Sequence, residues 1–199
     1  MYGHRMAPAT RPELRLDQIK ALTHPLRLAI LRELRSNGPA TATALGKRLG
    51  ESSGSTSYHL RQLAKHGFVE ELPETGDRRD RWWRPAMTGH HVEPARFVND
   101  PEQRAIVGVY QAQVVAGYAA RMDTYVSEQA AGEWSDEWAA AHDLSDFRLR
   151  LTPAQLRRLV TKLHAVVESY YRYDSPDAEE VVVQLGAFPR RARPFEAEQ

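Results

Sequence analysis

Closely spaced helix breakers divide the first third of the chain into four short helical segments. A first helix ends just before Pro25, and a second runs from that proline to the Asn-Gly-Pro sequence at 37–39. Thr41 caps a third helix, which Gly50 ends, and a fourth begins in the serine-rich run at 52–57. The leucines and isoleucine of the second and third helices fall on one face of each, which predicts a shared helical core.

Two strand patterns follow the fourth helix. Residues 68–72 and 81–85 have the composition of strands, and a tip rich in Pro, Gly and Asp joins them. Trp82 and Trp83 point to opposite faces of the second strand, so one of them should cover the core. Helices, a tight turn, a further helix and a hairpin are the order of elements in a winged helix-turn-helix.

The fourth helix has two chemically different faces at 100° per residue. One side is apolar or small and faces inward, with Thr56, Leu60 and Leu63. Small residues at the start of the other side would let the backbone approach the major groove of DNA closely. Serine hydroxyls and the free N–H groups of a helix start can also contact bases and phosphates. The alternative is that the serines only cap the helix, although capping needs a single hydroxyl.

The hairpin tip adds arginines beside this helix. They would reach the flanking phosphates or the minor groove, and the alternative is an ordinary solvated turn. The predicted DNA contacts are Ser53, Gly54, Ser55, Ser57, Tyr58, Arg61, Lys65, Arg78, Arg79 and Arg81.

Residues 24–71, HPLRLAILRELRSNGPATATALGKRLGESSGSTSYHLRQLAKHGFVEE, resemble the helix-turn-helix of the ArsR-type transcriptional repressors. The similarity lies in the Leu-Arg run after His-Pro, the Ser-x-Ser-Tyr-His-Leu helix and the Gly-Phe-Val entry into the wing. It implies a dimeric DNA-binding regulator that usually represses. It also implies base and phosphate contacts by Ser55, Ser57, Tyr58 and Arg61. Many relatives sense soft metals through cysteines on the preceding helix, where this chain has alanine and leucine.

Composition excludes several other classes of function. The chain has no cysteine, which removes disulfides, thiolate metal sites and cysteine nucleophiles. The adjacent His90 and His91 diverge, and His164 shares a helix face only with Glu168, so too few ligands converge for zinc. The sequence GESSG lacks the Lys-Ser/Thr ending of a phosphate-binding loop, and no Ser-His-Asp arrangement is evident. We therefore expect no metal, no cofactor and no enzymatic activity.

The back half begins with a strong helix signal at Asp100-Pro101. The helix should run to about Ala130, a length of about 45 Å at 1.5 Å per residue. Its apolar residues wrap around more than one face, so we expect a second subunit to cover them, the alternative being a core helix within a monomer. The predicted dimer interface consists of Ile106, Val109, Tyr110, Val114, Tyr118 and Met122.

The remaining chain resembles a small α/β unit. Residues 146–151 alternate like a strand, Thr152-Pro153 starts a helix that should reach about Arg172, and residues 181–188 have the pattern of a buried strand. The aromatic residues of this region either form its core, which we favour, or line a pocket for a small-molecule effector.

The net charge differs between the front and the back half of the chain. Residues 13–86 carry a net charge of +4 and residues 87–199 a net charge of −5, which favours a front half that meets a polyanion. No apolar run is long enough to span a bilayer, and the first 15 residues lack the apolar block of a secretion signal. We expect a cytoplasmic protein without membrane contact.

Together these observations predict a mainly α protein with a small β component, an α+β fold. Its predicted parts are a flexible N-terminus at 1–12, a winged helix-turn-helix DNA-binding domain at 13–90, a dimerisation and possible effector region at 97–190, and a tail at 191–199. The predicted function is a homodimeric repressor that reads a pseudo-palindromic site in double-stranded DNA through the helix at 53–66 and the wing at 73–81. Two alternatives stay open: a winged-helix module that contacts protein or RNA, and a metabolite-responsive sensor.

Overall fold

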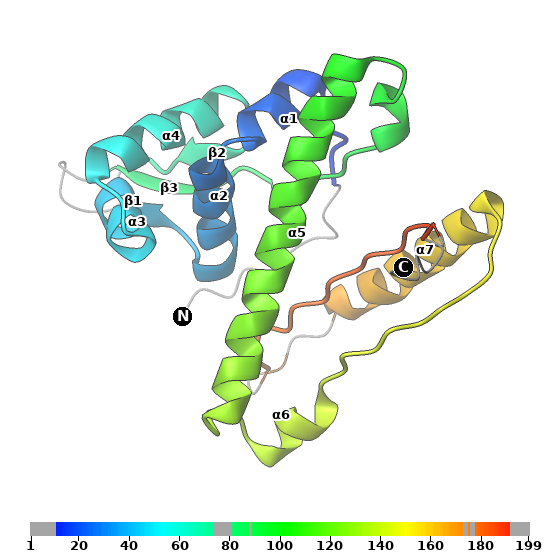
Figure 1. Cartoon of the computed structure of the whole chain (residues 1–199). Helices are drawn as coiled ribbons and strands as arrows, with labels where there is room; N and C mark the ends of the chain where they lie inside the picture. The colour runs from blue at the N-terminus through cyan, green and yellow to red at the C-terminus, as the bar shows by residue number, and fades with distance from the viewer. Residues whose placement is uncertain (1–10, 74–80, 88, 173–174, 176–177, 192–199) are drawn as a thin grey trace, which may run out of the picture. The chain divides into compact units, whose positions relative to one another are not determined.

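A computed structural model describes residues 11–73, 81–87, 89–172, 175 and 178–191 of the 199-residue chain (Figure 1). The described residues fall into two compact units. The N-terminal unit ends at Ala131, and the C-terminal unit begins at Gly132.

The four short helices predicted for the N-terminal unit are confirmed. They are α1 (Leu16–Leu22), α2 (Pro25–Asn37), α3 (Ala42–Leu49) and α4 (Ser53–Lys65). Local side chains cap three of them: the side chain of His24 accepts from the Leu26 backbone N–H, and Thr41 and Ser52 do the same for α3 and α4. Gly50 ends α3 in the left-handed conformation, with φ 68°, which favours glycine.

A three-stranded antiparallel sheet completes the winged helix. Its strands are β1 (Ala40–Thr41), β2 (Val69–Glu71) and β3 (Trp82–Pro85), in the order β1-β3-β2. The predicted hairpin is confirmed by the pairing of Val69 with Pro85. Strand β1 was not predicted from the sequence, because a two-residue strand has no periodicity. The predicted α+β class is thus confirmed.

One hydrophobic core lies among the helices and the inner face of the sheet. Trp83 is buried and Trp82 is exposed, which confirms that one of the two tryptophans covers the core. The chain after the wing returns to this core, where the His91 N–H donates to the Pro12 carbonyl and the Leu14 N–H donates to the His91 carbonyl. The buried hydrophobic residues are Leu14, Ile19, Ala21, Leu22, Leu28, Ile30, Leu31, Leu34, Ala40, Leu45, Leu60, Leu63, Phe68, Val69, Trp83, Phe97, Val107 and Tyr110.

A 3-10 turn, η1 (Pro94–Phe97), leads to the long helix α5 (Pro101–Ala130), which runs past α1 and α2 (Figure 1). The predicted start is confirmed, because the Asp100 carboxylate accepts from the backbone N–H groups of Glu102 and Gln103. Only Val107, Tyr110 and Gly117 of this helix are buried. Much of α5 is therefore solvent-exposed along its length.

Arg32 of α2 fixes how closely α5 approaches. Its Nη2 donates to the Gln113 carbonyl at 2.8 Å, and the Gln113 side chain donates to the Thr23 carbonyl. A Cβ on Gly117 would overlap the Arg32 guanidinium. Glycine at position 117 thus serves a close contact that the sequence alone does not indicate.

The C-terminal unit contains α6 (Asp136–Ala141), α7 (Pro153–Ser169) and a 3-10 turn, η2 (Tyr170–Arg172). The predicted start of α7 is confirmed by a capping box between Thr152 and Gln155. The predicted strands at 146–151 and 181–188 are wrong for the single chain, because neither segment is part of a strand in the structure. The second is also exposed rather than buried, with Phe188 80% exposed. A strand needs a hydrogen-bonded neighbouring strand, and the described part of the C-terminal unit forms no β-ladder.

Candidate nucleic-acid interface

Helix α4 presents the two faces expected from its sequence. Thr56, Leu60 and Leu63 are buried against the core. The opposite side is exposed at Ser53, Gly54, Tyr58, Arg61 and Lys65, and half-exposed at Ser55 and Ser57. The predicted reading face is therefore open to a ligand.

Capping uses one serine of the run. The Ser52 hydroxyl accepts from the Ser55 backbone N–H at 3.1 Å, and the buried Thr56 hydroxyl donates to the Ser52 carbonyl at 2.9 Å. Among the described residues, the hydroxyls of Ser53 and Ser57 have no hydrogen-bond partner, and both border the open face. Capping alone thus leaves these two hydroxyls unexplained.

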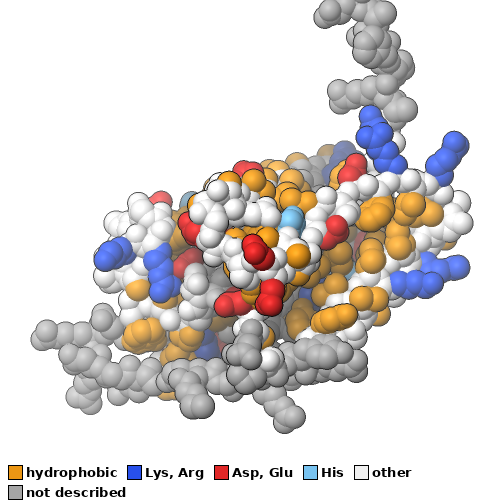
Figure 2. Space-filling view, turned by 90° about the horizontal axis from the view of Figure 1, so that it is seen from below, with side chains coloured by type: hydrophobic (Ala, Val, Ile, Leu, Met, Phe, Trp, Pro, Cys, Tyr) orange, Lys and Arg blue, Asp and Glu red, His pale blue; other side chains and the backbone are white. Residues whose placement is uncertain are grey.

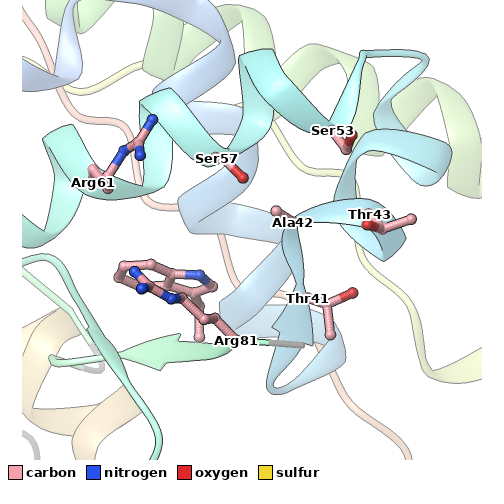
Figure 3. A pocket seen from close by; sticks show the side chains of 8 residues that line it. Thr41, Ala42, Thr43, Ser53, Ser57, Arg61 and Arg81 are labelled. Carbon is pink, nitrogen blue, oxygen red and sulfur yellow. The ribbon is translucent and has the colours of Figure 1, made fainter. Parts of the chain in front are cut away.

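A surface pocket joins α4 to the start of α3 and the base of the wing (Figure 3). In Figure 3, Ser53 and Ser57 lie on one side, the residues at 41–43 on another, and Arg81 below them. None of the lining side chains is acidic: they are Thr41, Ala42, Thr43, Ser53, Ser57, Arg61, Arg81 and Trp83. The first turns of α3 and α4 also carry no acidic residue. The positive ends of both helix dipoles are thus left for an external anion.

The turn between α3 and α4 is tight for a specific reason. The Glu51 N–H donates to the Gly46 carbonyl at 2.8 Å, and a Cβ on Gly46 would lie 2.7 Å from the Glu51 carbonyl oxygen. A larger residue at position 46 would push the start of α4 away from α3. The role of this glycine was not predictable from the sequence, because it depends on a contact across the turn.

At the base of the wing, acidic side chains accompany the arginines. Arg81 Nε lies 3.5 Å from a Glu71 carboxylate oxygen, and Arg84 Nε lies 2.7 Å from one of Glu70. Both pairs are exposed, so they contribute little to stability and can open when phosphate approaches. The predicted contacts Arg78 and Arg79 lie outside the described residues.

A cluster of rings flanks the reading face. The rings of His24 and His59 lie 4.2 Å apart, and the Tyr58 ring meets His59 edge-on at 5.1 Å. Burial, together with the neighbouring Arg27 charge, lowers the pKa of both histidines. Arg27 Nε is buried and has no hydrogen-bond partner among the described residues. Arg27 was not predicted as a site residue, because it is one of three arginines in α2 and the sequence does not distinguish it from Arg32 and Arg35.

The residues predicted to form a dimer interface have different surroundings. Tyr110 is already buried within the N-terminal unit, and its hydroxyl lies 2.7 Å from His90 Nε2. Ile106 and Val114 pack in part against the core. Val109 and Met122 are exposed, and Tyr118 is half-buried beneath the Arg121 guanidinium. A second subunit could therefore contact Val109 and Met122 but not the Tyr110 ring.

Other kinds of site find no support in the part of the chain that the structure describes. No group of three or more His, Asp or Glu side chains is placed to hold a metal ion there. The described helices also include none that is both long and apolar enough to cross a membrane.

Comparisons with known proteins place the motif. Residues 22–71 match a family model described as a helix-turn-helix domain. A search of the curated proteins found no match.

Among solved structures, the chain is similar to the homodimeric winged helix-turn-helix DNA-binding domain of Mb0332 from Mycobacterium bovis, described as a possible ArsR-family transcriptional regulator. That match has 24% identity and a TM-score of 0.33, and covers 53% of this chain and 81% of the other. NMB1585, a MarR family regulator from Neisseria meningitidis, shares 17% identity at a TM-score of 0.30. This match covers 73% of this chain and 74% of NMB1585. The adhesin competence repressor of Streptococcus pyogenes shares 14% identity at a TM-score of 0.32. This match covers 76% of this chain and 84% of the repressor.

TM-scores at this level carry no argument about function, so the family model and the geometry of residues 22–71 decide the assignment. This part of the chain is a helix-turn-helix domain, and the match supports a DNA-binding regulator.

Proposed function

We propose that this protein is a sequence-specific, DNA-binding transcriptional regulator that acts in the cytoplasm as a homodimeric repressor. The observation that supports the proposal best is the pocket between α3, α4 and the wing. It combines hydroxyls, two arginines and two helix starts, with no acidic side chain in its lining. This combination suits a phosphate of the DNA backbone.

Phosphate bound at this pocket would set the depth of α4 in the major groove. Thr41 and Thr43 stand at the start of α3, and Arg81 lies across from them, so the phosphate would be held between helix and wing. Ser57, Tyr58 and Arg61 would then face base edges or the adjacent backbone. The resemblance of residues 24–71 to ArsR-type repressors agrees with these roles.

A homodimer would carry two such reading heads. The exposed apolar side chains of α5, such as Val109 and Met122, offer a surface for a second copy. In a symmetric dimer the two α4 helices would enter successive major grooves, about 34 Å apart, and the bound site would be pseudo-palindromic.

The first experiment is binding of the purified full chain to a labelled fragment of its own upstream region, over a series of salt concentrations and with excess nonspecific DNA. Saturable, competitor-resistant binding is expected. Loss of all binding to competitor, both on this fragment and in a selection from random DNA, would contradict the proposal. Retention of an RNA or a protein in place of DNA would favour the alternative winged-helix module.

Arg61→Ala tests the reading face directly. Its affinity for the selected site should fall about 5- to 150-fold, since a base-contacting arginine contributes about 1–3 kcal/mol. Arg157→Ala removes the same charge from an exposed position of α7 and serves as the matched control. Equal affinity of both variants for the DNA site would show that Arg61 does not contact DNA.

The alternative of a metabolite sensor has less support from the described residues. Trp134 and Trp138 stack edge-on with centroids 6.4 Å apart, but Phe147 and Phe188 are exposed rather than gathered around a cavity. An effector pocket would therefore have to form on assembly.

A further inference from the structure

The ring cluster beside α4 borders the edge of the reading face that lies away from the pocket. At 100° per residue, Ser53 and Ser57 of the pocket stand at one edge of the exposed strip of α4. The exposed Tyr58 and then the buried His59 stand at the other edge. There the His24 ring, at the start of α2, lies 4.2 Å from the His59 ring. Different elements therefore border the two edges of α4: α3 and the wing at one, and the start of α2 at the other.

Arg27 brings a positive charge to this second edge. It follows His24 by three residues, so the two side chains share one face at the start of α2. The guanidinium is half-buried, its Nε is fully buried, and the side chain has no hydrogen bond or ion pair within the described chain. Holding a charge in this way costs free energy, and a bound external anion would offset that cost.

The cap of α2 makes His24 a hydrogen-bond donor. Its Nδ1 accepts from the Leu26 backbone N–H at 3.2 Å, so the proton of the neutral ring sits on Nε2. Burial, followed by the charge of Arg27, lowers the pKa of His24, and the ring therefore stays neutral at about pH 7.5. The residue is exposed, and its Nε2–H has no acceptor among the described residues. It can thus donate to an external oxygen beside Arg27.

We propose that Arg27 and His24 bind a backbone phosphate on the DNA strand opposite to the one that is held at the pocket. The inference rests on the proposed function and deepens it. An α-helix about 10–12 Å across fills a major groove about 12 Å wide, so the backbones of the two strands run along its two edges. The pocket would hold one strand, and Arg27 would hold the other. Contacts with both strands would fix the orientation of α4 in the groove.

Glu51, in the turn before α4, brings an opposing charge to this edge. It raises the pKa of both His24 and His59 against the effect of burial. On His24, however, the charge of Arg27 acts more strongly than that of Glu51. The Glu51 side chain is exposed and forms no ion pair with Arg27 within the described chain, so water and salt screen it more than the half-buried arginine. The positive charge therefore dominates at this edge.

Salt dependence tests the phosphate contact of Arg27. The affinity of the full chain for its selected DNA site is measured between about 50 and 200 mM salt. Arg27→Ala should reduce the slope of log affinity against log salt concentration by about 0.9, so the affinity lost over this range becomes about 3.5-fold smaller. Arg27→Lys keeps the charge and should keep the slope. A purely structural role would leave the slope unchanged in both variants, and an unchanged slope in Arg27→Ala would overturn the proposal.

Arg157→Ala is the matched control for the lost charge. Figure 2 shows that the Lys and Arg side chains on the side of the view where α7 lies stand apart from one another, with hydrophobic side chains between them. Arg157 occupies an exposed position of α7, so its removal should leave the slope unchanged. Urea unfolding shows whether each variant is folded. If Arg27→Ala is not, Arg27→Gln keeps most of the buried stem and loses only the charge, and the same reduction in slope is expected.

Single methylphosphonate substitutions identify the strand. Each replaces one charged phosphate by a neutral group, at every position of both strands of a half-site in turn. The phosphate bound by Arg27 is the one whose neutralisation weakens binding of the unmodified chain about fivefold and leaves binding of Arg27→Gln unaffected. Arg81→Ala identifies the pocket phosphate in the same way. The two phosphates are expected on opposite strands, and finding both on one strand would overturn the proposal.

His24→Asn separates the histidine donor from the arginine charge. Asparagine keeps an acceptor for the cap of α2 but is too short to replace the Nε2–H group. The affinity should fall about 2- to 12-fold while the slope stays unchanged, because a neutral donor neutralises no phosphate charge. Unchanged affinity would show that His24 does not contact the phosphate.

Failure of this inference is separable from failure of the proposed function. Saturable binding by the unmodified chain, together with an unchanged salt slope in Arg27→Ala and Arg27→Gln, would overturn the second phosphate contact and leave the DNA-binding regulator intact. Loss of all binding by the unmodified chain to competitor DNA would overturn both.

Discussion

Acidification should destabilise the N-terminal unit through His90. Its Nδ1 lies 3.2 Å from Arg35 Nη2, and its Nε2 lies 2.7 Å from the Tyr110 hydroxyl. Arginine can only donate, so Nδ1 accepts, and the ring proton sits on Nε2, which faces Tyr110. Burial, followed by the charge of Arg35, lowers the pKa of His90 from 6.5 to about 4. Protonation would therefore break the Arg35 contact and place two positive charges together.

The size of the effect follows from the two pKa values. The unfolded chain takes up the proton near its ordinary pKa of 6.5, whereas the folded chain resists until about 4. The stabilisation is thus complete above about pH 6.5 and is lost as pH falls towards 4. At about pH 5 the free energy of unfolding should be lower by about 2 kcal/mol, and by about 3 kcal/mol once pH is below the folded pKa.

Urea unfolding at about pH 7.5 and about pH 5, followed by tryptophan fluorescence, measures this difference. His90→Gln keeps a donor and an acceptor but does not titrate, so its free energy of unfolding should change by about 2 kcal/mol less between the two pH values. His142→Gln, at an exposed position, is the control and should behave like the unmodified chain. Equal pH dependence in the unmodified chain and His90→Gln would refute the reasoning.

Three substitutions test other contacts in the N-terminal unit. Gly46→Ala should lower the free energy of unfolding by about 1–3 kcal/mol, because its Cβ would meet the Glu51 carbonyl at 2.7 Å, whereas Gly108→Ala has open space and should raise it by up to about 1 kcal/mol. Gly117→Ala should lower the free energy of unfolding by about 1 kcal/mol in urea, since it displaces Arg32 from Gln113. In an Arg32→Ala background the same change should raise the free energy of unfolding by about 1 kcal/mol, because alanine favours the helix. A change of the same sign in both backgrounds would contradict the contact. Arg81→Ala should reduce the slope of log affinity for DNA against log salt concentration by about 1, and an unchanged slope would exclude a phosphate contact.

Local chemistry made most of the N-terminal fold predictable. Pro25, Gly50 and the cap residues Thr41 and Ser52 act within one or two turns of their own position, so their effect can be inferred from sequence. The same holds for the start of α5 at Asp100, where the carboxylate satisfies the first free N–H groups. Helix bounds and the two faces of α4 were accordingly predictable.

Contacts between positions far apart in the sequence were not predictable. Arg32 and Gln113 are 81 residues apart, and Arg35 and His90 are 55 apart, yet these pairs fix where α5 and the segment after the wing lie. Nothing in the local pattern distinguishes a helix arginine that spans two elements from one that faces solvent. The pocket lining was missed in part for the same reason, because Thr43 becomes relevant only when α3 meets the wing.

The strand predictions in the C-terminal unit show a different limit. Alternation at 146–151 and the valines at 181–183 are typical of strands, but the structure assigns neither segment to a strand. A strand, however, is defined by its hydrogen-bond partner, which periodicity does not name. The prediction of strands from this pattern was therefore wrong for the single chain.

The two units differ in where their apolar side chains find cover. All the buried hydrophobic residues that the structure describes belong to the N-terminal unit, so contacts within this unit fix α4 and the described strands of the wing. The described residues of the C-terminal unit include no buried side chain. In the proposed complex, affinity for one half-site would therefore depend on contacts within the N-terminal unit. The distance between two half-sites would depend on contacts between copies, for which the exposed Val109 and Met122 of α5 offer a surface.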